Sequence, residues 1–145
     1  MQVKEYLELV TAHKNIIRNL ENSIKDLNDM LYSYSLGGSI FNTKVQTSRT
    51  NDKMGELVAK IDDRQRELQK ELDKYLDFRT KVENEINALE DSTGSRVLYN
   101  RYIRSMMWED IANDMIFSVR MVHNYHKKAL KEFENKYCTM LKNAG

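Results

Sequence analysis

The chain contains no proline in its 145 residues, and it has one cysteine and only five glycines. Proline interrupts helices and marks many turns, so its absence favours long helices over a sandwich or a barrel. The lone cysteine, Cys138, excludes an internal disulfide and is typical of a reducing compartment. The composition therefore predicts an all-α protein in a reducing compartment.

Long apolar runs are also missing from the sequence. No stretch reaches the roughly 18 apolar residues that span a bilayer, and no basic start is followed by an apolar segment. Charged residues make up 31% of the chain and aromatic residues 9%, a balance that favours long solvated helices. We expect a cytoplasmic protein with no membrane partner.

The formal net charge of +1 hides an uneven distribution. Residues 1–94 contain 14 Lys and Arg against 17 Asp and Glu, whereas residues 95–145 contain 9 against 5. Local excess charge attracts partners of opposite sign. An anionic partner is therefore expected at the last third of the chain.

A regular apolar stripe runs along residues 3–35, where the spacings alternate between four and three. A mean spacing of 3.5 keeps these side chains on one face of a helix and is typical of a coiled-coil seam. The stripe comprises Tyr6, Val10, His13, Ile17, Leu20, Ile24, Leu27, Leu31 and Tyr34. Within it we predict an oligomerisation surface formed by Val10, Ile17, Leu20, Ile24, Leu27 and Leu31.

A polar segment, residues 36–52, separates this helix from a second one. It includes Gly37 and Gly38 and many Ser, Thr and Asn residues, which predicts a flexible loop. A second striped helix follows from about Lys53 to Asp91. The two helices predict a long, coiled-coil-like antiparallel hairpin over residues 1–91. Because two helices alone bury little apolar surface, we expect a homo-oligomer, either a dimer or a larger bundle.

Three shorter helices are predicted in residues 92–145, after a polar break at residues 90–95. They cover residues 96–104, residues 108–115 and a last segment that begins after a cap at Ser118. The small Ala112 permits two of these helices to approach closely. A short helix, a tight turn and a longer helix predict a helix-turn-helix head.

The residues of this head also resemble a known group of proteins. The run comprises Leu98, Arg101, Tyr102, Trp108, Glu109, Asp110, Ile111, Ala112, Met115, Ser118, Val122, Ala129 and Leu130. It resembles region four of the bacterial housekeeping sigma factor, and more closely the phage ArpU/RinA-type late-gene transcription regulators of Gram-positive bacteria. The resemblance implies a sequence-specific DNA-binding regulator that acts in the cytoplasm of a bacterial host, with host RNA polymerase as a further partner.

Two positions depart from that pattern. Ile116 and Phe117 stand where the turn usually has a glycine, and Met107 stands where a Ser or Thr cap is usual. The missing cap forgoes about 1 kcal/mol. The geometry of the turn, and with it the position of the last helix, is therefore open from the sequence.

In a helix-turn-helix, the last helix enters the major groove with its N-terminal half. The outward residues expected there are Ser118, Val119, Arg120, Met121, His123, Asn124 and Lys127. Asn124 is suited to an adenine edge and Arg120 to guanine or a phosphate. Cations expected to contact phosphates of double-stranded DNA are Arg101, Arg104, Lys127, Lys128 and Lys131.

Catalytic and metal chemistry find little support in the sequence. His123 and His126 are three residues apart, a spacing suited to a metal, but no third ligand is evident. The acidic residues near Asp62 and Glu67 alternate with Arg64 and other cations, which predicts ion pairs on a solvated helix face. We therefore expect no enzyme activity, no metal and no cofactor.

Two other functions remain open from the sequence. A small-terminase-like DNA-packaging protein also joins a helix-turn-helix to an oligomerising helical region, and a ring of subunits would favour it. A protein-interaction module could instead capture a host protein through the helical hairpin. The substituted turn glycine and Met121, where relatives often have Arg, keep this second alternative open.

Overall fold

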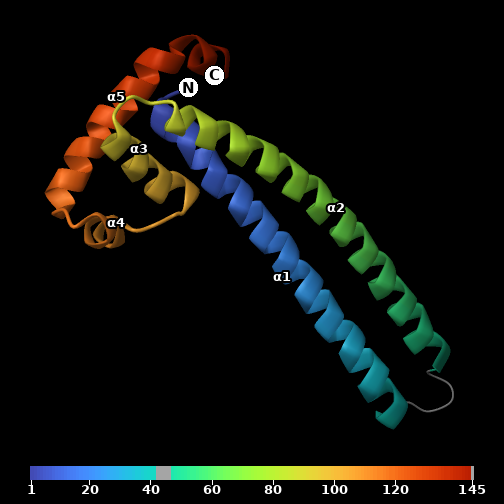
Figure 1. Cartoon of the computed structure of the whole chain (residues 1–145). Helices are drawn as coiled ribbons and strands as arrows, with labels where there is room; N and C mark the ends of the chain where they lie inside the picture. Colours follow the sequence, from blue (N-terminus) through green and yellow to red (C-terminus); the bar gives the residue numbers. More distant parts are fainter. Residues whose placement is uncertain (42–46, 145) are drawn as a thin grey trace. The chain divides into compact units, whose positions relative to one another are not determined.

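The computed structural model describes residues 1–41 and 47–144, and in these two ranges the chain is helical with no strand. The elements are α1 (Val3–Phe41), α2 (Thr47–Asn87), α3 (Ser92–Leu98), the π-helical turn η1 (Tyr99–Ile103), α4 (Trp108–Met115) and α5 (Val119–Ala144). The all-α prediction is confirmed: a long N-terminal helical hairpin, α1 and α2, precedes smaller helices (Figure 1). None of the helices that the structure describes is long and apolar enough to span a bilayer.

The predicted loop over residues 36–52 is wrong for most of its length. Helix α1 continues to Phe41 and α2 begins at Thr47, so Gly37 and Gly38 belong to a helix. Residues 42–46, the centre of the predicted loop, lie outside the described residues. A glycine in a helix interior costs about 1 kcal/mol relative to alanine, which is not enough by itself to end a helix.

The chain divides into two compact units whose boundaries fall inside the long helices. The first, here called the head unit, combines Met1–Lys14 with Tyr75–Gly145. The second, here called the hairpin unit, comprises Asn15–Lys74. The head unit therefore extends beyond the expected boundary between residues 91 and 92. It includes the first turns of α1 and the last turns of α2.

A continuous apolar core explains why the first turns of α1 belong to the head unit. Their buried residues pack with residues of α2, α3, η1 and α5. This core comprises Val3, Tyr6, Leu7, Val10, Val82, Ile86, Leu89, Leu98, Tyr102, Ile103, Ala129, Phe133 and Leu141. Val10, which the stripe assigned to an oligomer surface, is fully buried here. It belongs to the chain's own core, because a helix packs its apolar face against the nearest available apolar surface.

A buried carboxylate lies in the head unit between α1, α2 and α5. The Tyr6 hydroxyl donates a 2.6 Å hydrogen bond to Glu85 Oε1, and the Tyr137 hydroxyl donates to the Glu85 carbonyl oxygen at 3.1 Å. Burial and the neighbouring carboxylate raise the pKa of Tyr6 above its usual value. Tyr137 also marks a kink in α5, with φ −117° and ψ 25°. These hydrogen bonds join α1 to α2 and α5 to α2, in addition to the apolar contacts of the core.

The hairpin unit buries much less of its apolar stripe. Its buried apolar residues are Ile17, Leu57 and Ile61. The rest of the predicted oligomerisation set, Leu20, Ile24, Leu27 and Leu31, is only half-buried. An open groove of about 540 Å³, lined by residues of both helices including Leu27 and Arg64, lies between α1 and α2.

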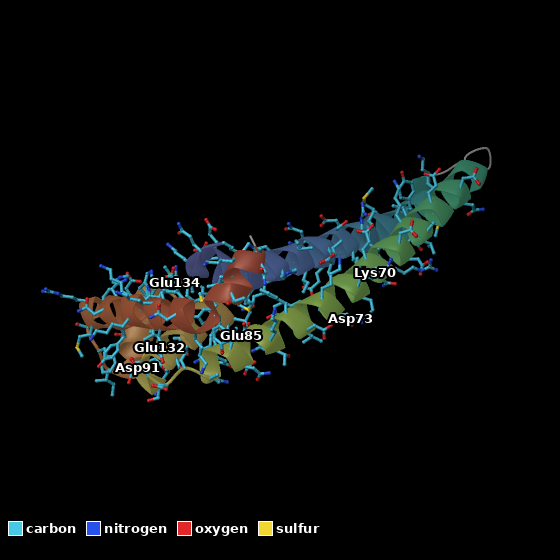
Figure 2. All side chains as sticks on the ribbon, turned by 90° about the horizontal axis from the view of Figure 1, so that it is seen from above. Lys70, Asp73, Glu85, Asp91, Glu132 and Glu134 are labelled. Atoms are coloured by element: carbon cyan, nitrogen blue, oxygen red, sulfur yellow. The ribbon has the colours of Figure 1, made fainter. Side chains whose placement is uncertain are left out.

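Charged side chains cover the outer face of α2 in the hairpin unit, Lys70 and Asp73 among them (Figure 2). Arg66 pairs with Asp62 at 2.9 Å and Arg64 with Glu67 at 3.0 Å. These are the ion pairs predicted from the sequence. Each is exposed and contributes only tenths of a kcal/mol.

Candidate nucleic-acid interface

A second, smaller core shapes the helix-turn-helix. Val97 of α3, Ile111 and Ala112 of α4 and Val122 of α5 are buried together. Half-buried residues that surround them are Met106, Trp108, Met115, Phe117 and Tyr125. The predicted bounds of α4, residues 108–115, agree with the structure. Because all three helices contribute to this core, α5 is held at a defined angle to α4.

The first head helix begins earlier than predicted. Asp91 caps α3, with its side chain accepting a 3.1 Å hydrogen bond from the Thr93 amide. Helix therefore includes residues 92–95, which were expected to belong to a break. The buried Gly94 explains the difference: a Cβ added there would lie 2.9 Å from Ala129 Cβ. This glycine permits α3 to approach α5 closely, and it is not a turn residue.

The turn between α4 and α5 adopts the expected geometry without a glycine. Ile116 has φ 58° and ψ 43°, in the left-handed region. The Phe117 amide donates to the Ala112 carbonyl at 2.9 Å, and the Ile116 amide donates to Asn113 at 3.4 Å. These two bonds form a Schellman motif, which ends a helix and redirects the chain. The open question about the position of α5 is thereby answered, at the expense of strain in a β-branched residue.

The N-termini of α4 and α5 agree with the sequence-based predictions. Met107 is the N-cap of α4 and makes no side-chain hydrogen bond. Glu109 and Asp110 in the first turn of α4 complement the helix dipole instead. Ser118 caps α5, because its Oγ accepts a hydrogen bond from the Met121 amide at 3.2 Å. The Ser118 side chain, listed among the DNA contacts predicted above, is thus committed to the start of the helix.

The outer face of α5 carries a polar stripe opposite the packed residues. Arg120, Asn124, Lys127 and Lys131 are spaced by four, three and four residues and are all exposed. Val122 and Ala129 on the opposite side are fully buried. Since a helix has 3.6 residues per turn, these spacings hold the four side chains on one line. Lys128 lies beside that line and is also exposed.

The cations of this stripe are free of carboxylates. In the part of the chain that the structure describes, Arg120, Lys127 and Lys131 form no ion pair, and residues 119–131 contain no Asp or Glu. Lys128 Nζ lies 5.9 Å from the centre of the Tyr125 ring. By contrast, Arg64, Arg66, Lys74 and Arg96 each pair with an acidic residue. Cations without a paired carboxylate give this helix face a positive electrostatic potential.

Arg101 is held by intramolecular contacts and is a poorer candidate for a phosphate contact. Its guanidinium lies 4.4 Å from the centre of the Trp108 ring, and its Nη1 donates to the Met106 carbonyl at 2.9 Å. Both contacts restrain the segment between η1 and α4. Part of the Arg101 side chain is still exposed, and its contact with a phosphate stays a prediction.

The two histidines of α5 both contact the Trp108 ring. The His123 ring centre is 4.6 Å from that of Trp108, so His123 is half-buried and does not project outward as predicted. His126 is buried, with Nε2 2.7 Å from the Tyr102 hydroxyl. Burial lowers the pKa of His126 to about 4, and the neighbouring His123 acts in the same direction.

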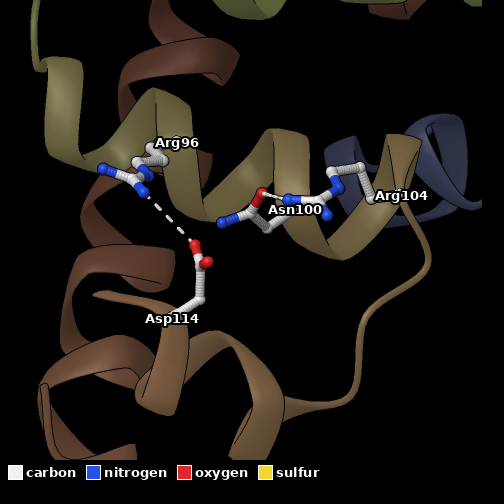
Figure 3. A network of polar contacts seen from close by, with 4 residues as sticks. All are labelled: Arg96, Asn100, Arg104 and Asp114. Carbon is white, nitrogen blue, oxygen red and sulfur yellow. Dashed lines mark hydrogen bonds and ion pairs between the residues drawn. The ribbon is translucent and has the colours of Figure 1, made fainter. Parts of the chain in front are cut away.

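Two polar contacts lie close together in the head (Figure 3). Arg96 of α3 pairs with Asp114 of α4 at 3.2 Å. Arg104 Nη1 donates to Asn100 Oδ1 at 3.4 Å and remains largely exposed. Arg104 is therefore still accessible to a phosphate, whereas Arg96 connects two helices of the head.

Lys14 is a positioning residue that the sequence did not reveal. Its Nζ donates a hydrogen bond to the Ile103 carbonyl and another, of 3.0 Å, to Ser105 Oγ. Ser105 has a φ of 57°, so these contacts fix a left-handed turn directly after η1. The contacts join residues 89 and 91 positions apart. No local pattern in the sequence points to a pair so distant.

Of the predicted DNA-contacting residues, one group shares the outer face of α5 and another does not. The exposed group comprises Val119, Arg120, Met121, Asn124, Lys127, Lys128 and Lys131. Arg104 is exposed as well but lies outside α5, and Ser118 is exposed with its Oγ capping the helix. His123 and Arg101 are half-buried in contact with Trp108. The chain matches no family model, and no curated protein or solved structure is significantly similar to it.

Proposed function

We propose that this protein is a sequence-specific DNA-binding transcription regulator whose α5 enters the major groove. The observation that carries the proposal is the stripe of Arg120, Asn124, Lys127 and Lys131, exposed and without ion pairs on the last helix of a helix-turn-helix. A cationic helix of this kind suits a duplex because phosphates flank the major groove on both sides.

The residues of the stripe divide into two roles. Arg120 and Asn124 lie in the first two turns of α5, where a recognition helix meets base edges. Asn124 suits a bidentate contact with adenine, and Arg120 suits guanine. Lys127, Lys128 and Lys131 lie further along the helix and supply phosphate contacts, which add affinity but little sequence information.

The class of regulator that we propose is the phage ArpU/RinA type, acting in the cytoplasm of a bacterial host with host RNA polymerase as its protein partner. The residues that carry this resemblance include Ile111, Ala112 and Val122, which form the small core of the head. The resemblance thus concerns the residues that position α5. A small-terminase-like packaging protein would use the same surface on DNA.

A paired set of variants tests the two roles. We expect Arg120→Ala combined with Asn124→Ala to abolish the specific gel shift of a duplex selected from a random-sequence pool. We expect Lys128→Ala combined with Lys131→Ala to keep sequence preference and to reduce the slope of log affinity against log salt by about 0.9 for each lost phosphate contact.

The control for both pairs is Thr139→Ala with Lys142→Ala, on the exposed C-terminal part of the same helix. Helicity measured by circular dichroism should be unchanged in all three double variants. Retention of the specific shift by the Arg120 and Asn124 pair would contradict the proposal.

We also propose that the protein is a homo-oligomer through the hairpin unit. The support is the set of half-buried residues Ile24, Leu27 and Leu31 beside the exposed Ile16 and Met30. A two-helix unit leaves such a stripe partly in contact with water, and burying it in a bundle is favourable.

Analytical ultracentrifugation of the full chain should give a dimer, and Ile24→Asp with Leu31→Asp should give a monomer. Asn28→Asp with Asn22→Asp, at exposed positions of the same helix, is the matched control. Trp108, the single tryptophan, reports that the head unit remains folded. A ring of eight or more subunits would favour the packaging function, and a monomeric wild type would refute oligomerisation.

A further inference from the structure

Exposed apolar side chains of the head unit are frequent in the segment that runs from the N-cap of α4 to the first turn of α5. Its described residues include six large apolar side chains that are exposed, and four of them lie between residues 107 and 121. Their exposed fractions are 64% for Met107, 91% for Ile116, 37% for Val119 and 42% for Met121. Apolar side chains gain free energy on leaving water, so those on the proposed DNA-binding helix are candidates for a contact with the partner.

Val119 and Met121 are the two of these that belong to α5 itself. They flank Arg120 in the first turn of the helix and precede Asn124 by less than two turns. Neither belongs to the core clusters of the head unit. The first turn of α5 therefore presents an apolar, a cationic and an apolar side chain in succession.

The charge around these two residues identifies the kind of surface that fits them. The unpaired cations Arg120, Lys127 and Lys128 lie on the same helix, so the partner is a polyanion with apolar groups between its charges. Duplex DNA has this character, since the 5-methyl group of thymine is the apolar group displayed in the major groove. An apolar groove of a protein would leave these cations unmatched.

We infer that Val119 and Met121 contact thymine 5-methyl groups on either side of the base that Arg120 reads. This inference rests on the proposed DNA binding and specifies which bases the surface recognises. With the adenine contact of Asn124, the recognised sequence contains thymines at the positions under the first turn of α5 and an adenine one turn further along.

The test uses the selected duplex synthesised in several forms, with each thymine replaced in turn by uracil, which lacks only the methyl group. We expect the affinity of the wild-type protein to fall about fourfold for each contacted methyl, the factor that corresponds to burying one such group. Val119→Ala combined with Met121→Ala should bind the thymine and uracil forms of those positions equally. Leu76→Ala, at an exposed apolar position elsewhere in the head unit, should keep the wild-type preference.

Each other outcome is decisive. Equal affinity of the wild-type protein for every thymine and uracil form would overturn the inference and leave the proposed DNA binding intact. A preference that persists in the Val119 and Met121 double variant would overturn it as well, and loss of RNA polymerase binding by that variant would then assign the apolar residues to a protein contact. If no duplex is retained at low salt, both the inference and the proposed function fail.

Discussion

Ile116 occupies a backbone conformation that β-branched residues rarely adopt, with φ 58° in the turn between α4 and α5. The left-handed region costs a residue with a Cβ about 1–2 kcal/mol, whereas glycine adopts it freely. The side chain is almost fully exposed, so its removal loses no buried contact. The strain is therefore not repaid by packing within the chain.

We predict that Ile116→Gly stabilises the protein by about 1 kcal/mol, net of the greater freedom of glycine in the unfolded chain. Urea unfolding followed by Trp108 fluorescence measures this change as a higher midpoint at an unchanged slope. Ile116→Ala keeps the Cβ and should change stability little. A glycine variant no more stable than the alanine variant would show that the turn carries no such strain.

His126 links the stability of the head to pH. Burial is the main reason that its pKa falls to about 4, and the charges of His123, Lys4 and Arg101 add to the effect. Its ring also meets the Tyr102 hydroxyl and the edge of Trp108. Burial raises the pKa of Tyr102 to about 12, so that hydroxyl stays protonated over the same range.

Between pH 6.5 and 4 the unfolded chain binds a proton at His126 that the folded chain does not bind. The contribution of His126 is fully present above pH 6.5 and decreases as the pH falls toward 4. We predict a loss of about 3 kcal/mol in the free energy of unfolding across this window. Denaturant titrations at several pH values should show this loss in the wild type and a flatter profile in His126→Gln. Identical profiles would contradict a buried, neutral His126.

At the scale of elements, the closest approach in the head is that of α3 to α5. A Cβ at Gly94 would lie 2.9 Å from Ala129 Cβ and 3.2 Å from Asp91 Oδ2, and the first of these has no room to move. Ala129 is fully buried and Asp91 is the cap of α3, so neither neighbour can shift freely. The glycine is therefore required by packing and not by backbone conformation.

We predict that Gly94→Ala lowers the free energy of unfolding by about 1–3 kcal/mol, because overpacking outweighs the better helix propensity of alanine. Gly55→Ala is the matched control, since nothing lies within 4 Å of a Cβ there. That variant should gain about 1 kcal/mol. Partial recovery in Gly94→Ala with Ala129→Gly would identify the clash, and equal gains at both glycines would refute it.

Elements with a strong local pattern were predictable from the sequence. The bounds of α4 and the Ser118 cap follow from residues within one or two turns of each other. Gly37 and Gly38 misled because a glycine in a helix interior costs only about 1 kcal/mol and does not by itself end the helix. Gly94 resembled a break because its role depends on Ala129, 35 positions further along the chain.

The candidate site was predictable on the outer face of α5 and less so around it. Arg120, Asn124, Lys127 and Lys131 are exposed because the spacing of Val122 and Ala129 fixes which side of the helix is buried. The contacts of His123 and Arg101 with Trp108 were not predicted, because they join different elements. Periodicity describes one helix at a time and carries no information about such contacts.

At the scale of the whole molecule, the head unit is built from segments far apart in the sequence. Val3, Tyr6 and Leu7 pack in one core with Phe133 and Leu141. The sequence suggested that residues 92–145 form a domain of their own. Because about half of this core comes from residues outside 92–145, we expect that residues 92–145 do not fold alone.

We predict that a fragment comprising residues 92–145 lacks a cooperative unfolding transition, because its α5 would expose the apolar face that residues 1–14 and 75–91 cover. Circular dichroism on heating provides the measurement, with the full chain as the reference. Addition of the missing segments in a fused chain that omits residues 15–74 should restore the transition. A fragment that unfolds cooperatively at the same temperature as the full chain would contradict this prediction.

The discontinuous head also imposes an order in time. A ribosome emits the first turns of α1 more than 100 residues before their partners Phe133 and Leu141. Until then, Leu7 and Val10 have no complete core to enter. The outer face of α5 is therefore held in place only after translation has passed the last turns of α5, so a chain that stops before them would have a hairpin and an incomplete head core.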